Sequence, residues 1–401
     1  MKTGIYGGTF DPPHLGHRSA ALEAKKRLGL DRIVLIPAGE PPHKELSPLS
    51  APSAARLEMT RLMADGMDPW GESVGVSDIE LDRAGLSYTV DTLRELQRRY
   101  PGDELWLLMG TDMLLSFHTW RDPGAICALA HLCAFTRSPE DDLAAMEAAA
   151  ERLRKEFGAD ITVFRLEDGV DISSSQLRAD ISHQEEQAGE HLWSQVYGYI
   201  LREGLYEASA DLKRLDYPRL RAVSYSMMRA KRIPHVQGTE EEAAKLAQRW
   251  GGNVDHARRA AILHDCTKYL TVDEHLALCG KYGISLDPLE QKGEKLLHAK
   301  TGAAVAYHVF GEPEPVCAAI YYHTTGKANM SLLEKILYIA DYMEPHRDFP
   351  GVEDLRRLAY EDLDGAIILG CQMSVAEMRE KRREIHPNTL AALEFLKGME
   401  A

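Results

Sequence analysis

The feature that most constrains the fold is a short stretch near the start of the chain. Residues 7–17 read GGTFDPPHLGH, after an apolar run at residues 4–6 and before a helical pattern at residues 18–28. Gly7 and Gly8 allow backbone conformations and close approaches that a Cβ atom would block. The helix that follows presents unpaired N–H groups and the positive end of its dipole. A strand, a glycine turn and a helix in this order therefore predict a phosphate-binding site.

Two histidines in the same stretch strengthen this prediction. His14 and His17 are three residues apart at the start of the predicted helix, so both side chains can face one ligand. An imidazole can donate a hydrogen bond to a phosphate oxygen in its neutral and in its protonated form. A glycine pair alone would be a weak signal, but glycines, Asp-Pro-Pro and two histidines within eleven residues indicate a dedicated anion site.

The segments that follow alternate between strand and helix patterns. Residues 32–37 form a second apolar run, which completes a βαβ unit with parallel strands. Further strand patterns lie at residues 74–77, 104–109, 131–136 and 161–166. We therefore expect an α/β domain with a parallel sheet, which binds its ligands at the carboxyl ends of the strands.

Loops at these predicted strand ends carry candidate ligand contacts. Lys44, in a proline-rich loop, is either a phosphate contact or an ordinary solvated lysine. Asp112 lies in a loop that we expect to face the ligand, and Trp120 either stacks on a planar ring or packs in the core. Ser87 or Thr89 is expected to cap the next helix.

A second anion site is predicted near the end of this half. Ser173, Ser174 and Ser175 precede a helical pattern, and Arg178 follows one turn later. Hydroxyls and backbone N–H groups at a helix start bind anions, and a guanidinium adds a planar pair of donors. A plain N-cap would account for one of the serines but not for all three together with the arginine.

Bulk properties limit the class of protein. With 401 residues the chain is too long for one ordinary core, so we expect two domains. The net charge of −15 argues against broad nucleic-acid binding, and no apolar run approaches the roughly 18 residues of a membrane span. There is no signal-peptide pattern, and the six cysteines have no regular spacing, so we expect reduced thiols in a cytoplasmic protein without nucleic-acid or membrane partners.

The pattern changes after residues 208–211, which read as a linker. From residue 214 to the end the chain is nearly all helical, which predicts an all-α domain. The informative pair is His264-Asp265 at the end of an apolar helix, and further polar residues also lie beside apolar ones and should point inward. Buried ionisable groups are costly unless they are paired or bound to metal. The expected metal ligands are His235, His264, Asp265, His298, His323 and Asp341.

The mixed imidazole and carboxylate set suits Fe, Mn, Co or Zn better than Mg or Ca. The remaining histidines of this half lack the same apolar context, and we interpret them as surface residues or as supports for the ligands. They are His256, His275, His308 and His346.

Residues 1–207 resemble the bacterial nicotinate mononucleotide adenylyltransferases, which have a Rossmann-like nucleotidyltransferase fold. The motifs that carry the resemblance are GGTFDPPHLGH at 7–17, PPHK at 41–44, SYTVDTL at 87–93, GTD at 110–112 and ISSSQLR at 172–178. The resemblance implies transfer of an adenylyl group from ATP to nicotinate mononucleotide, assisted by Mg²⁺, which yields deamido-NAD and pyrophosphate. It implies ATP or substrate contacts from Gly7, Gly8, Thr9, Phe10, Asp11, His14, His17, Lys44, Tyr88, Thr89, Asp112, Trp120, Ser173, Ser174, Ser175 and Arg178. Among these, His14, His17 and Arg178 should hold the ATP phosphates, with Lys44 near them, and Tyr88, Thr89 and Trp120 should frame the nicotinate.

Residues 212–401 resemble the HD-domain phosphohydrolases, and more narrowly the bacterial enzymes that hydrolyse diadenosine tetraphosphate symmetrically to two ADP. The matching segments are LHDCTK at 263–268, LLHAKTGA at 296–303, YYHTTG at 321–326, ADYMEPHRDFPGVEDLR at 340–356 and the region of His235. The resemblance implies a dinuclear centre, commonly iron, with the six ligands named above. Lys268, and less directly Arg347, should hold the flanking phosphates.

Two alternatives for the second half stay open. It hydrolyses another nucleotide, such as a mononucleotide or a guanosine alarmone, or it only senses a nucleotide or a metal. The intact set of candidate ligands favours hydrolysis, because a sensor need not keep a hydrolytic centre. The oligomeric state is left open.

Overall fold

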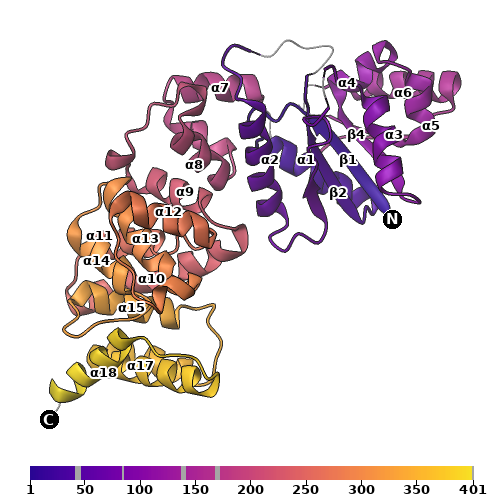
Figure 1. Ribbon diagram of the computed structural model, residues 1–401. Coiled ribbons are helices and arrows are strands. Elements are labelled where there is room, and N and C mark those ends of the chain that lie inside the picture. Colours follow the sequence, from indigo (N-terminus) through magenta and orange to yellow (C-terminus); the bar gives the residue numbers. More distant parts are fainter. Residues whose placement is uncertain (41–46, 84, 137–140, 168–171, 400–401) are drawn as a thin grey trace. The chain divides into compact units, whose positions relative to one another are not determined.

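A computed structural model describes the chain except for residues 41–46, 84, 137–140, 168–171 and 400–401. The described part divides into two compact units, Met1–Ser209 and Ala210–Ala401 (Figure 1). Each unit is described by itself.

The first unit is built on a parallel sheet. Its strands run in the order β3-β2-β1-β4-β5-β6 among the described residues, and each neighbouring pair is parallel. The chain builds outward from β1 through β2 and β3, and then crosses to build β4, β5 and β6 on the other side. The order therefore reverses between β1 and β4, which is where an open α/β sheet forms a ligand crevice. The strands are β1 (Lys2–Gly8), β2 (Arg32–Pro37), β3 (Val74–Val76), β4 (Glu104–Gly110), β5 (His131–Phe135) and β6 (Ile161–Phe164).

Helices connect the strands and cover both faces of the sheet. In chain order they are α1 (Leu15–Leu28), α2 (Ser53–Met67), α3 (Thr89–Arg99), α4 (Thr111–Ser116), η1 (Phe117–Thr119), α5 (Pro123–Leu129), α6 (Leu143–Phe157), α7 (Ser174–Ser182), η2 (Glu186–His191), α8 (Ser194–Glu203) and η3 (Leu205–Glu207). Figure 1 shows α1 and α2 near the indigo strands and α3 to α6 in the magenta part of the unit.

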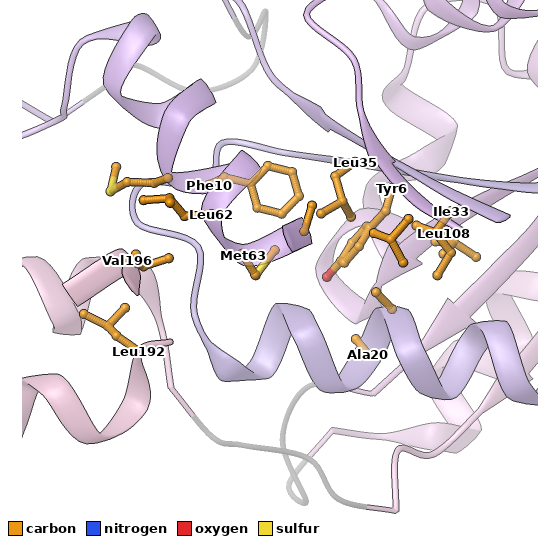
Figure 2. Packing of buried hydrophobic residues seen from close by; sticks show 14 of the residues in the cluster. Tyr6, Phe10, Ala20, Ile33, Leu35, Leu62, Met63, Leu108, Leu192 and Val196 are labelled. Atoms are coloured by element: carbon orange, nitrogen blue, oxygen red, sulfur yellow. The ribbon is translucent and has the colours of Figure 1, made fainter. Parts of the chain in front are cut away.

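Successive side chains of a strand point to opposite faces, so the sheet separates two apolar clusters. Tyr6 belongs to the cluster formed with α1, α2 and α8, where Figure 2 shows it beside Leu35 and Leu108. Ile5 belongs to the other cluster, which is formed with α3, α5 and α6. Burial of both strand faces explains why the strands read as continuous apolar runs.

The second unit contains helices and, among its described residues, no strand. In chain order the helices are η4 (Leu212–Arg214), α9 (Tyr217–Ser226), η5 (Ala230–Arg232), α10 (Ile233–Trp250), α11 (Val254–Leu263), α12 (Val272–Tyr282), η6 (Glu290–Lys292), α13 (Glu294–His308), α14 (Glu314–Tyr322), α15 (Leu332–Met343), α16 (Val352–Glu361), α17 (Leu363–Glu380) and α18 (Pro387–Met399). The apolar helix α11 packs against α9, α10, α14 and α15. Its end therefore places His264 and Asp265 in the middle of the helices that carry the other candidate ligands.

The expected fold class, a parallel α/β sheet followed by an all-α domain, is confirmed. Two local expectations are wrong. The ligand-facing loop expected at the end of the strand that leads to Asp112 is instead the helix α4 (Thr111–Ser116). The helix α3 has Tyr88 at its N-cap with no side-chain capping bond, and the Ser87 hydroxyl donates instead to the Glu80 carbonyl at 3.2 Å. No described helix combines the length and apolar character that a membrane crossing requires.

Candidate functional site

The first unit has a cavity of about 850 Å³ that includes the crevice beside the end of β1. Of the residues expected to bind ligand in this half, all that the structure describes line this cavity. They are Gly7, Gly8, Thr9, Phe10, Asp11, His14, His17, Tyr88, Thr89, Asp112, Trp120, Ser173, Ser174, Ser175 and Arg178. Lys44 lies outside the described residues.

The two histidines meet at the N-terminus of α1. The backbone N–H of His14, which is the N-cap residue, donates to His17 Nδ1 at 3.2 Å, and the two ring centroids are 3.8 Å apart. A neutral His17 that accepts at Nδ1 must carry its proton on Nε2. Nε2–H is therefore the donor of this ring, and an N–H donor is what an anion site requires.

Beneath the glycine turn, Phe10 and Asp11 serve as supports more than as exposed contacts. Phe10 has a left-handed backbone (φ 49°), and its ring is 1% exposed and lies 5.0 Å from that of His17 between ring centroids. The Asp11 carboxylate is also 1% exposed, and its Oδ1 accepts bonds from the Tyr206 hydroxyl at 2.8 Å and the Ala51 backbone N–H at 3.0 Å. Burial and the adjacent charge of Asp11 raise the pKa of Tyr206, so its hydroxyl remains a donor.

Arg178 ties the start of α7 to the turn. Its guanidinium donates to the Asp11 carbonyl at 2.6 Å and lies 3.5 Å from the Asp11 carboxylate. It also donates to the Ser175 hydroxyl at 3.2 Å. The guanidinium is nearly buried yet lines the cavity, so its position is fixed before a ligand arrives.

The three serines have three different roles. Ser173 caps α7 by accepting from the Gln176 backbone N–H at 3.1 Å, and Ser174 donates to the Pro12 carbonyl at 3.0 Å. Ser175 accepts from Arg178. The capping explanation thus holds for Ser173 alone, whereas Ser174 joins the start of α7 to Pro12 and Ser175 supports Arg178 within α7.

Aromatic and polar side chains of α3, α4 and residues 120–121 also line the cavity. Tyr88 and Thr89 are half-buried at the start of α3, and the guanidinium of Arg121 lies 4.5 Å from the centroid of the Tyr88 ring. Trp120 packs on Phe117 with a centroid distance of 5.0 Å and also lines the cavity. Asp112 is exposed in the first turn of α4. The two interpretations of Trp120 are therefore compatible, since one part of the indole packs while another faces the cavity.

Sequence reasoning missed two charged residues at this site, one buried (Arg56) and one half-buried (Glu80). Arg56, on α2, is 2% exposed and donates to the carbonyls of Thr9 and Ala38 at 2.9 and 2.8 Å. Burial lowers the pKa of Arg56, and the charge of Asp11 partly offsets this effect. Glu80 lines the cavity, and burial raises the pKa of its carboxyl although a bond from Thr92 opposes the change. The sequence near Arg56 reads as an ordinary amphipathic helix and gives no signal.

In the second unit, the six candidate ligands converge from α10, the end of α11, α13, the end of α14 and α15. His235 Nε2 lies 3.0 Å from Asp341 Oδ1, and His298 Nε2 lies 3.2 Å from Asp265 Oδ1. Two overlapping trios have donor atoms within 4.8 Å of one another: His235 with His264 and Asp341, and His264 with Asp265 and His323. The structure thus brings together all six residues that were expected to share a metal centre.

The imidazoles are oriented as metal ligands should be. The Nδ1 atoms of His264 and His323 each lie 2.6 Å from a backbone carbonyl, those of Ala261 and Ile320. A carbonyl only accepts, so the proton is on Nδ1 and the lone pair of Nε2 points to the other donors. This donor set fits a transition metal ion.

The surroundings of this cluster set the protonation states of its carboxylates and imidazoles. Burial alone would raise the pKa of Asp265, but His264, His298 and Lys268 hold it well below its ordinary range. Burial lowers the pKa of His323 to about 3, so this imidazole is neutral near pH 7. Deprotonated carboxylates and neutral imidazoles are the forms that bind metal.

Three cations surround the carboxylates. Lys268 Nζ lies 3.0 Å from Asp265 Oδ1, and an Arg347 amino group lies 2.9 Å from Asp341 Oδ1. Arg232, which sequence reasoning missed, lies 2.5 Å from Asp265 Oδ2. Its position three residues before His235 was the available signal. Cations beside a metal centre are suited to a substrate with several phosphates.

Comparisons with known proteins match each unit separately. The family model described as cytidylyltransferase-like matches residues 5–180, and the HD domain model matches residues 232–346. A probable nicotinate-nucleotide adenylyltransferase from Maridesulfovibrio salexigens is 42% identical over 38% of this chain and 68% of its own length. A relative with the same description from Trichlorobacter lovleyi is 35% identical over 52% of this chain and all of its own length.

For the second half, a symmetrical bis(5'-nucleosyl)-tetraphosphatase from Halalkalibacterium halodurans is 42% identical over 40% of this chain and 86% of its own length. The chain therefore belongs to the nicotinate-nucleotide adenylyltransferase family through its first half, to which an HD domain is fused as its second half.

Proposed function

We propose that the first half transfers an adenylyl group from ATP to nicotinate mononucleotide. The observation that carries this proposal is the cavity at the switch point of the sheet, which is lined by His14, His17, Arg178 and the N-termini of α1 and α7. The names of the relatives supply the acceptor nucleotide.

In this reaction a phosphate oxygen of nicotinate mononucleotide attacks the α-phosphorus of ATP. The bond from that phosphorus to the oxygen leading to the β-phosphate breaks, and pyrophosphate leaves. The attacking oxygen is already an anion, so the chain's task is alignment and stabilisation of charge on the phosphates. His17 Nε2–H, the Arg178 guanidinium and the helix N–H groups are placed for this, and no general base is needed. Mg²⁺ carried by ATP would neutralise part of the phosphate charge.

The test is pyrophosphate release by the purified chain mixed with ATP and nicotinate mononucleotide. We expect deamido-NAD as the second product. If pyrophosphate were released with ATP and nicotinamide mononucleotide but not with ATP and nicotinate mononucleotide, the assigned acceptor would be wrong.

We propose further that the second half hydrolyses diadenosine tetraphosphate symmetrically, so that the chain is bifunctional. Six convergent ligands and three adjacent cations support hydrolysis of a polyphosphate, and the name of the Halalkalibacterium relative supports this substrate. Two bound transition metal ions, iron by resemblance, would polarise the phosphate and supply hydroxide near neutral pH. Lys268, Arg232 and Arg347 would hold the flanking phosphates.

The product distinguishes this function from its alternatives. Symmetric cleavage of diadenosine tetraphosphate gives ADP alone, whereas a mixture of AMP and ATP would contradict it. Turnover of a different nucleotide would reassign the substrate, and no turnover with any of Fe²⁺, Mn²⁺, Co²⁺ or Zn²⁺ would favour a sensing role. Metal analysis of the chain as purified identifies the resident ion.

A further inference from the structure

One buried carboxylate lies beside the six proposed metal ligands without belonging to them. Glu344 directly follows α15 and is 1% exposed. Its Oε1 lies 3.0 Å from His235 Nδ1, while His235 Nε2 lies 3.0 Å from Asp341 Oδ1. The two nitrogens of one imidazole therefore face two different carboxylates.

The protonation of the ring follows from the two contacts together. Both carboxylates can accept a hydrogen bond, but a metal ion held by Asp341 would use the lone pair of His235 Nε2, which leaves the ring proton on Nδ1 for Glu344 to accept. His264 and His323 reach the same state through carbonyls three residues earlier in the chain. His235 instead uses a charged acceptor that is 109 residues away. Because a carboxylate withdraws the Nδ1 proton more strongly than a carbonyl does, His235 becomes the more basic ligand.

Glu344 is itself held in place by its neighbours. Its Oε2 accepts from the His346 backbone N–H at 2.7 Å and lies 3.0 Å from His346 Nδ1. Arg356 donates to the carbonyls of Met343 and Glu344, both at 2.8 Å. The carboxylate therefore has little freedom to turn away from His235.

A glycine in α10 makes room for this carboxylate. A Cβ atom at Gly238 would lie 2.5 Å from Glu344 Oε2, 3.1 Å from Pro345 Cδ and 3.2 Å from His346 Nδ1. Glycine within a helix costs roughly 0.5–1 kcal/mol relative to alanine, so its presence here calls for a compensating reason. Close approach of residues 344–346 to the helix that carries His235 supplies that reason.

We propose that Glu344 is a positioning residue of the metal centre, which fixes His235 as an Nδ1-protonated ligand, and that Gly238 is required for its approach. The inference rests on the proposed metal centre of the second half. It assigns a role to two residues that donate no ligand atom.

The test is Co²⁺ binding by the chelator-treated full-length chain. The affinity is measured by calorimetry, and the coordination of the bound ion by its visible absorption. We expect Glu344→Ala to weaken Co²⁺ binding by about 10- to 100-fold, the usual effect of removing such a support. Glu344→Gln keeps an oxygen that accepts from His235 and should weaken binding less than Glu344→Ala. Gly238→Ala should also weaken binding, but should add little in a chain that already carries Glu344→Ala.

A matched control separates positioning from general destabilisation. Glu334 is a carboxylate on the same helix, 2% exposed, which pairs with Lys327 at 2.8 Å. Glu334→Ala should leave Co²⁺ affinity unchanged. If Glu344→Ala bound Co²⁺ as tightly as the wild-type chain, or if Glu334→Ala lost as much affinity as Glu344→Ala, the inference would be overturned while the metal centre would stand. Failure of the wild-type chain to bind Co²⁺ would overturn the metal centre and the inference together.

Discussion

Replacing Asp11 with asparagine tests whether a buried charge holds the nucleotide site together. The Asp11 carboxylate accepts from Tyr206 and Ala51 and lies 3.5 Å from the Arg178 guanidinium, which is 8% exposed. Asparagine keeps one oxygen for the two hydrogen bonds, but its NH₂ group then faces Arg178. The buried guanidinium thereby loses its negative partner.

The loss of folding stability expected for Asp11→Asn follows from the burial of the ion pair. Removing one partner of a buried ion pair costs about 3–5 kcal/mol, and the 3.5 Å separation places this pair near the lower end, about 3 kcal/mol. This is a large share of the roughly 5–15 kcal/mol that stabilises a domain. The KM for ATP should also rise, because Arg178 keeps its bonds to the backbone carbonyl of residue 11 and to Ser175 but loses the carboxylate that helps to hold it at the cavity.

The assay is urea unfolding followed by tryptophan fluorescence. Four of the five tryptophans lie in the first unit, so a Trp250→Phe background makes the signal report on that unit. Asp11→Asn and Arg178→Ala should each lower its free energy of unfolding. Their combination should cost less than the sum, by about 0.5–3 kcal/mol, because the two residues are coupled.

The control is an ion pair that is shorter but exposed. Arg154 and Glu151 are 2.6 Å apart with side chains 35% and 55% exposed. Glu151→Ala removes this pair and should change the stability by less than about 1 kcal/mol. If Asp11→Asn were as mild as Glu151→Ala, burial would not be the reason for the strength of the Asp11–Arg178 pair.

Four further predictions follow from the same structure. His17→Ala should lower kcat for pyrophosphate release on the order of 10²–10³-fold, and an equal fall in diadenosine tetraphosphate hydrolysis would contradict its local role. Arg56→Met should raise the KM for ATP and cost about 1–3 kcal/mol, since two loop carbonyls lose their donor; an unchanged urea midpoint would refute this. Asp265→Ala should abolish metal loading of the second half while sparing pyrophosphate release, as metal analysis of the variant would show. The pKa of His323 is about 3 in the folded chain against 6.5 as the ordinary value, so the unfolded chain binds more protons between these pH values. The chelator-treated second half should therefore lose stability as the pH falls from about 6.5 toward 3. A melting temperature, measured by circular dichroism, that rises on acidification would contradict this.

The sequence was most informative where chemistry is concentrated in short segments. The stretch at residues 7–17 predicted a phosphate site because glycines, histidines and a helix start have local effects that do not depend on distant residues. His264-Asp265 likewise predicted a metal site, because two ionisable residues at the end of an apolar helix are costly to bury unless they are paired or bound to metal. The strand patterns predicted the sheet because burial on both faces leaves an apolar run.

The sequence was least informative about residues that act through distant partners. Arg56 reads as one polar position of an amphipathic helix, and only its contacts with Thr9 and Ala38 show that it holds two loops of the site. Arg232 and Glu344 are charged residues in polar stretches, and their neighbours Asp265 and His235 come from other helices. The position of Arg232 three residues before His235 was a signal for the residue itself, but no local pattern could reveal which distant residue pairs with Arg232 or with Glu344.

The sequence by itself thus determined which side chains are available for phosphate and metal chemistry, because motif spacing and hydrophobic periodicity are local properties of the chain. Only the tertiary structure decided how they are held. Asp11 meets Tyr206 across 195 residues, and His235 meets Glu344 across 109. Such contacts depend on how helices and strands pack, and packing is a property of the folded chain as a whole.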